Sequence, residues 1–115
     1  MANRKLQNYL RMYRKRSGFS QAEIAFLLGS DSGAKISRYE RFKQEPCLRT
    51  ALACEAILQV PIRELFAGMF DEAERKAVLK MTKLTQQFAV NPPTDRKRMK
   101  LLLITLQKHS KLFND

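Results

Sequence analysis

Hydrophobic side chains recur every three or four residues through most of the chain, which is the spacing of helices with one buried face. Leu6, Leu10 and Tyr13 form the first such stripe. Residues that favour turns and helix ends, chiefly glycine and proline, separate one stripe from the next. The pattern predicts an all-α protein with helices over residues 3–16, 20–28, 34–41, 48–58, 61–66, 71–90 and 94–113.

The segment 20–41 carries the clearest local signals, and these predict two short helices joined by a turn. Ser20 is a good N-cap, and Glu23, three residues later, completes a capping box. Gly29 suits the left-handed residue that ends a helix. Residues 30–33 have turn composition, and we expect Asp31 or Ser32 to cap the second helix of the pair.

The second helix of this pair has one apolar face and one polar, cationic face. Ile36 and Tyr39 point toward the core at helical spacing, with Phe42 next in line. The opposite face presents Lys35, Ser37, Arg38 and Arg41. A free helix face of cations and hydroxyls is typical of an element that reads DNA in the major groove.

The next segments complete the predicted core. The loop 42–46 exposes Lys43 and main-chain N–H groups, both suited to a phosphate. We expect the helix over 48–58 to bury Leu48, Leu52, Ile57 and Leu58, with Cys54 as a small core residue. Pro61 then opens a short helix at its favoured first position.

The pattern changes after Gly68, which marks the predicted boundary between domains 1–68 and 69–115. Asn91, Pro92 and Pro93 end a helix that starts at Asp71. Thr94 or Asp95 caps a last helix whose cationic start, residues 96–100, opposes the helix dipole. One apolar stripe runs along that helix, and Leu101 and Ile104 widen it; its members are Met99, Leu102, Leu103, Leu106, Ser110 and Phe113. This helix either packs on its own domain or, as we favour, helps to form a dimer.

The charge balance points to a polyanionic partner. The formal net charge is +11 and the pI is about 10.1, values that favour association with nucleic acid through counterion release. Residues 1–50 hold 11 Lys/Arg and 4 Asp/Glu, a net of +7, whereas residues 51–115 hold 11 and 7, a net of +4. The excess is therefore larger in the half that contains the two short helices.

The chain shows no pattern of catalytic or cofactor chemistry. His109 is the only histidine and has no partner at metal-ligand spacing, and no phosphate-loop, dinucleotide or nucleophile motif occurs. We predict no enzyme activity, no cofactor and no metal. No run approaches the ~20 apolar residues of a membrane span, and the N-terminus lacks a signal-peptide core, so a cytoplasmic protein is expected. Cys47 and Cys54 are then expected to stay unbridged.

Residues 10–66 resemble the Cro/C1-type (XRE) helix-turn-helix family of DNA-binding regulators. The matching segments are YRKRSGFSQAEIAFLLG, ISRYE and EPCLRTALACEAILQVPIRELF. The resemblance implies a five-helix, lambda-repressor-like domain, here followed by a C-terminal helical extension, that works as a dimer on a two-fold operator. The chain departs from the family in a turn one residue longer between Gly29 and Ile36, and in Cys47, where a capping serine is common.

The resemblance also implies roles for individual residues. Bases would be read by Lys35, Arg38, Ala34 and Ser37, with Gly33 beside them, and a phosphate would be held by Gln21. Apart from the resemblance, the residues themselves predict further phosphate contacts at Ser32, Arg41 and Lys43. Arg14 and Glu40 occupy the places of a structural ion pair. The sequence therefore predicts a DNA-binding transcriptional regulator, favoured as a dimeric repressor. The alternative is a protein-interaction module such as the antitoxin of a toxin–antitoxin pair.

Overall fold

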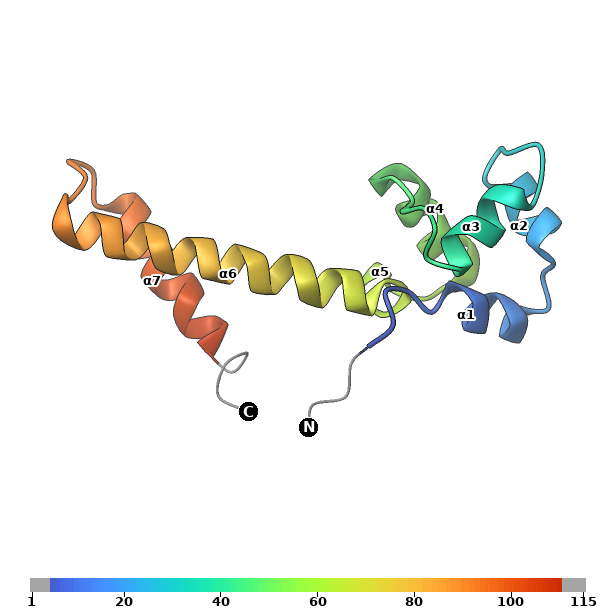
Figure 1. Cartoon of the computed structure of the whole chain (residues 1–115), viewed down its shortest axis with the longest axis horizontal. Helices are drawn as coiled ribbons and strands as arrows, with labels where there is room; N and C mark the ends of the chain where they lie inside the picture. Colours follow the sequence, from blue (N-terminus) through green and yellow to red (C-terminus); the bar gives the residue numbers. More distant parts are fainter. Residues whose placement is uncertain (1–4, 111–115) are drawn as a thin grey trace. The chain divides into compact units, whose positions relative to one another are not determined.

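The computed structural model describes residues 5–110 and confirms the all-α fold, because every regular element in that range is a helix (Figure 1). The chain divides into two compact units, Met1–Phe70 and Asp71–Asp115. The helices are α1 (Leu10–Ser17), α2 (Gln21–Leu27), α3 (Ala34–Glu40), α4 (Leu48–Leu58), α5 (Ile62–Leu65), α6 (Ala67–Val90) and α7 (Lys97–Lys108).

The first unit contains one hydrophobic core, and all five of its short helices contribute residues to it. Leu10 from α1, Ile24 from α2 and Ile36 from α3 are at most 1% exposed. The remaining core residues are Ala25, Tyr39, Ala51, Cys54, Leu65 and Phe66. Ala25 supports the close approach of α2 to α3, because its side chain adds little bulk between the two backbones.

The first helix starts later than the sequence predicts. It begins at Leu10 rather than at residue 3, and positions 3 and 4 lie outside the described residues. The N–H groups of Gly68 and Met69 donate to the carbonyl oxygens of Leu6 and Gln7, which holds this stretch out of a helix. Leu6, predicted to face the core, is consequently half exposed.

Helix α4 has the predicted bounds, and Cys54, Ile57 and Leu58 pack on the core as predicted, but two of the predicted core residues do not. Leu48 and Leu52 were expected in the core, yet they are 69% and 51% exposed. The buried residues of α4 are Ala51 and Cys54, which are small enough for the helix to pack closely on its neighbours. Burial raises the pKa of Cys54 to about 11, so its thiol stays protonated in the core.

Helix α6 runs without a break through Gly68 and starts before the predicted Asp71. A Cβ atom at position 68 would overlap the carbonyl group of Leu6, so this position requires glycine. The close approach lets Gly68 N–H donate to Leu6 over 2.9 Å. The division into compact units falls at residues 70/71, two positions beyond the predicted boundary.

The second unit consists of most of α6 and an antiparallel α7 (Figure 1). Arg98 on α7 lies over the ring of Phe88 on α6, 5.4 Å from its centroid, and His109 lies 3.6 Å from Glu74. Asp95 caps the start of α7 by accepting a hydrogen bond from Lys97 N–H. The predicted Phe113 lies outside the described residues.

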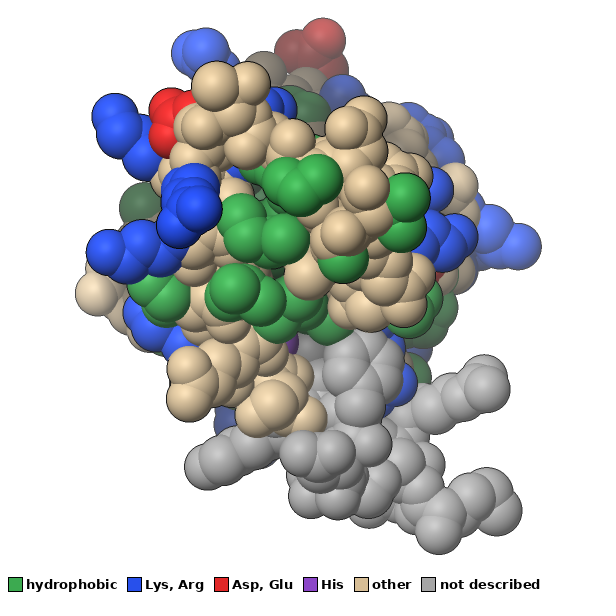
Figure 2. Space-filling view, turned by 90° about the vertical axis from the view of Figure 1, so that its left-hand side faces the viewer, with side chains coloured by type: hydrophobic (Ala, Val, Ile, Leu, Met, Phe, Trp, Pro, Cys, Tyr) green, Lys and Arg blue, Asp and Glu red, His purple; other side chains and the backbone are tan. Residues whose placement is uncertain are grey.

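Much apolar surface of the second unit is exposed. No residue of α7 is buried, and its exposed large hydrophobic side chains are Leu101, Leu103 and Ile104. Figure 2 shows hydrophobic side chains gathered on one face, with Lys and Arg side chains around them. No helix among residues 5–110 is long and apolar enough to cross a membrane.

Candidate nucleic-acid interface

Helices α2 and α3 and the turn between them form a compact pair. Ser20 accepts a hydrogen bond from Glu23 N–H, and Glu23 accepts one from Ser20 N–H, so both halves of the predicted capping box are present. Gly29 adopts the left-handed conformation at φ +79° and ends α2 as predicted. At Gly33 an added Cβ would lie only 3.1 Å from Gln21, so the longer turn still packs closely on the start of α2.

A buried ion pair joins α1 to the end of α3, between the two residues for which the family resemblance implies one. Arg14 Nε donates to Glu40 Oε2 over 2.5 Å, and Nη2 donates to Oε1 over 3.1 Å. Arg14 Nη1 donates to the Phe19 carbonyl, so the guanidinium also holds the chain that enters α2. Hydrogen bonding to Glu40 raises the pKa of Arg14 above its usual value, despite the opposing effect of burial.

Gln21 at the start of α2 joins the same network. Its Nε2 donates to Glu40 Oε1 over 3.0 Å. A side-chain amide has two N–H donors, and this hydrogen bond uses one of them. The second donor and the nearby main-chain N–H groups of the helix start remain suited to a phosphate. Glu40 thus orients Gln21 while Arg14 neutralises Glu40.

The outer face of α3 presents the residues predicted to read bases. Ala34, Lys35 and Arg38 are exposed, and Ser37 is half buried. Arg38 Nε donates to Gln44 Oε1 over 3.1 Å, which positions the guanidinium while its terminal nitrogens stay available for a guanine edge. Lys35 and Arg38 are three positions apart and therefore lie on one side of the helix.

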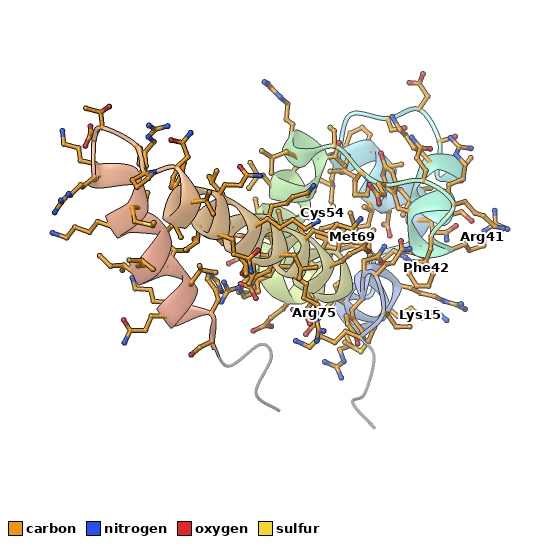
Figure 3. The ribbon with its side chains drawn as sticks, turned by 60° about the vertical axis from the view of Figure 1, so that its left-hand side comes forward. Lys15, Arg41, Phe42, Cys54, Met69 and Arg75 are labelled. Atoms are coloured by element: carbon orange, nitrogen blue, oxygen red, sulfur yellow. The ribbon has the colours of Figure 1, made fainter. Side chains whose placement is uncertain are left out.

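The end of α3 has an unusual backbone. Phe42 adopts the left-handed conformation at φ +62°, which a bulky residue rarely does, and it is 40% exposed instead of continuing the apolar stripe. Its N–H donates to Tyr39 and the N–H of Lys43 donates to Arg38, which together cap the helix. Figure 3 shows Arg41 pointing away from the domain, while Phe42 and Lys15 line one cavity of about 400 Å³.

Two further predicted positions lie at the edges of this surface. Ser32 is exposed, and its hydroxyl accepts from Ala34 N–H over 3.4 Å, a long hydrogen bond. Cys47 is the N-cap of α4 but makes no capping hydrogen bond. Instead its thiol lies 3.3 Å from the Thr50 hydroxyl; this contact is the main cause of a lowered Cys47 pKa, and the charge of Lys35 adds a smaller effect.

Sequence reasoning missed two positioning residues, Asn8 and Gln44. Asn8 is buried, donates to the Tyr39 carbonyl and accepts from Leu10 N–H, so it fixes α1 against α3. An asparagine two positions before a helix is a recognisable start signal, but the apolar stripe through Leu6 obscured it. Gln44 holds Arg38 from a loop, where the sequence gives no periodic signal.

No group of three or more His, Cys, Asp or Glu side chains within residues 5–110 is arranged to hold a metal ion. A family model described as Helix-turn-helix matches residues 10–65. Comparisons with curated proteins and with solved structures found no match to the chain.

Proposed function

The chain belongs, through residues 10–65, to the Cro/C1-type helix-turn-helix family of DNA-binding regulators, and from this membership we propose that it is a repressor that binds a two-fold operator as a homodimer. The observation that carries the proposal is the outer face of α3. Lys35 and Arg38 are exposed there, and the buried network around Glu40 holds the helix in place.

In the proposed complex, α3 enters the major groove with its N-terminus first. Arg38 makes the bidentate contact with guanine O6 and N7, and Lys35 reaches the same edge from the first turn. Ala34 offers a methyl contact to thymine, and Ser37 lies at the border between base and phosphate. Phosphates on either side are held by Gln21, Ser32, Arg41 and Lys43.

Homodimerisation is the second part of the proposal, and α7 supports it. Leu101, Leu103 and Ile104 expose an apolar surface that a lone helix in water does not favour. A second copy of the chain would cover this surface and bring two α3 helices to the two halves of an operator. We favour repression because occupying DNA is sufficient for it, whereas activation also needs a contact with the polymerase.

The alternative is the antitoxin of a toxin–antitoxin pair, and the same apolar surface on α7 favours it. In that case a different protein would cover Leu101 and Ile104, and DNA binding would be secondary. Purification from the native host separates the two possibilities, because an antitoxin would come with a tightly bound partner and a repressor would come as a homodimer.

Selection of bound sites from random duplex DNA tests the proposal directly. We expect two inverted half-sites whose centres are about 10 base pairs, or a multiple of that, apart. Recovery of a single half-site would contradict binding as a dimer. Recovery of no preferred sequence would contradict sequence-specific repression.

A further inference from the structure

The stretch 75–110 carries more unbalanced positive charge than the segment 10–65, although the whole second unit has ten Lys/Arg and five Asp/Glu, a net of +5. Residues 75–110 contain nine Lys/Arg and one acidic residue, Asp95, a net of +8. Residues 10–65 contain ten Lys/Arg and six Asp/Glu, a net of +4 over a longer stretch. All nine cations of residues 75–110 are exposed: Arg75, Lys76, Lys80, Lys83, Arg96, Lys97, Arg98, Lys100 and Lys108.

Few of these charges are neutralised within the unit. Lys76 pairs with Glu72 over 3.0 Å, and Arg98 lies over the Phe88 ring. Among the described residues, no carboxylate forms an ion pair with any of the other seven. The cations at residues 96–100 also oppose the dipole of α7, an arrangement that costs helix stability. Their presence is therefore not explained by the folding of the unit.

The α6 cations form a row on the side that faces away from α7. Phe88 contacts Arg98 on α7 and Glu74 contacts His109, the residue that follows α7; the two lie about four turns apart on one face of α6. Lys76, Lys80 and Lys83 follow at i, i+4 and i+7 on the opposite face. With a rise of 1.5 Å per residue, the row spans roughly 10 Å along the helix.

A second group of cations starts just past the turn that ends α6. Arg96, Lys97 and Lys100 come within ten residues of Val90, the last residue of that helix. These three side chains line a single cavity with Pro92, Pro93 and one carboxylate, Asp95. The six exposed cations of these two groups are Lys76, Lys80, Lys83, Arg96, Lys97 and Lys100, and we call them together the C-terminal cationic patch.

We propose that the C-terminal cationic patch binds the phosphate backbone of duplex DNA, independently of base sequence. Rows of exposed lysines bind phosphates as point charges, and each contact releases condensed counterions. The patch lies on the same chain as the helix-turn-helix domain, so a duplex held by α3 is present near the patch at high effective concentration. The second unit thereby adds affinity for DNA but no sequence preference.

The salt dependence of binding tests this proposal without any knowledge of the operator. We would replace Lys80, Lys83, Lys97 and Lys100 by Gln in the full-length chain and measure binding to random-sequence duplex from 50 to 200 mM salt. Each lost phosphate contact lowers the slope of log K against log salt by about 0.9. We expect the slope to fall by two units or more. Replacement of the same four residues by Arg keeps the charge and should keep the slope.

Three results would overturn the proposal. The first is a salt slope for DNA binding by the Gln variant that lies within half a unit of the wild-type slope. This outcome would overturn the proposal even if the wild-type patch were found to bind anionic vesicles. The second is an equal loss in the Arg variant, which would trace the effect to something other than charge. The third is lost helicity by circular dichroism in the Gln variant but not in the Arg variant. Because random duplex is used, failure here leaves operator recognition by α3 intact.

Discussion

The two units of the chain differ in how many side chains they bury and of which kind. The first unit holds every buried polar or charged side chain found among residues 5–110, namely Asn8, Arg14 and Glu40, together with most of the apolar core. Among residues 71–110 of the second unit, only Val78 is buried. The first unit therefore fixes the geometry of α3 from within, whereas the second keeps its apolar and cationic side chains available for partners.

Mutation of the buried ion pair should have the largest effect on stability, and this loss of stability should be confined to the first unit. Replacing Arg14 by Met leaves Glu40 buried without its main partner, which should cost about 3–5 kcal/mol of unfolding free energy. Replacing Glu40 by Leu as well should recover much of the loss. Urea unfolding of both single variants and the double variant measures the coupling, and additive effects would contradict the assigned role.

A matched pair of leucine truncations sharpens the comparison between the units. Leu10 is fully buried, so Leu10→Ala should cost about 2–5 kcal/mol of unfolding free energy. Leu101 is 66% exposed, so Leu101→Ala should change the stability of the monomer little. If α7 dimerises the chain, the same change should raise the dimer dissociation constant in ultracentrifugation. Equal destabilisation by both changes would mean that α7 is packed within its own unit.

On the proposed DNA-binding surface, we compare a residue expected to read bases, Arg38, with one expected to bind a phosphate, Gln21. Arg38→Ala should cost about 1–3 kcal/mol of binding free energy and relax the preference at one base pair in each half-site. Gln21→Ala should weaken binding to all sequences alike, because a phosphate contact carries no base information. Site selection with both variants measures this. An unchanged profile for Arg38→Ala, with only the salt slope altered, would make Arg38 a phosphate contact.

The smallest effect is expected at the start of α4. Cys47 has the N-cap backbone of Ser20, with ψ 165° in both, yet its side chain caps nothing. Cys47→Ser supplies a hydroxyl in that geometry and should stabilise the first unit by about 0.5–1 kcal/mol. Cys47→Ala is the control that removes the thiol without adding a cap. If Cys47→Ser unfolds at the same temperature as Cys47→Ala, the introduced hydroxyl does not cap α4.

Sequence reasoning located the elements whose signals are local. The bounds of α2 follow from Ser20, Glu23 and Gly29, all of which act within one turn of the helix ends. The start of α1 could not be found in this way, because main-chain hydrogen bonds to Gly68 and Met69 decide it from far along the chain. A periodic pattern scored by hydrophobicity detects helices but carries no information on such pairing.

The same limit explains the error in the predicted packing of α4 and the hydrogen bonds at the candidate site that were not predicted. Cys54 was predicted in the core, but Leu48 and Leu52 gave a stronger apolar pattern than the small Ala51, which is the residue that is buried. At the candidate site, residue types placed Lys35 and Arg38 on the free face of α3. The hydrogen bonds that orient Arg38 through Gln44 and Gln21 through Glu40 depend on loop and side-chain geometry, which only coordinates provide.

The main-chain pairing of residues 6–9 with residues 65–69 has a consequence for the domain as a portable module. Tyr9 N–H donates to Leu65, and Gly68 and Met69 donate to Leu6 and Gln7. A fragment cut at residues 10 and 65 would keep Gln21, the whole of α3 and Lys43, but it would lose all three hydrogen bonds, each worth about 0.5–1.5 kcal/mol. The unit that can be grafted onto another protein with its fold intact is therefore longer at both ends than the segment that identifies the family.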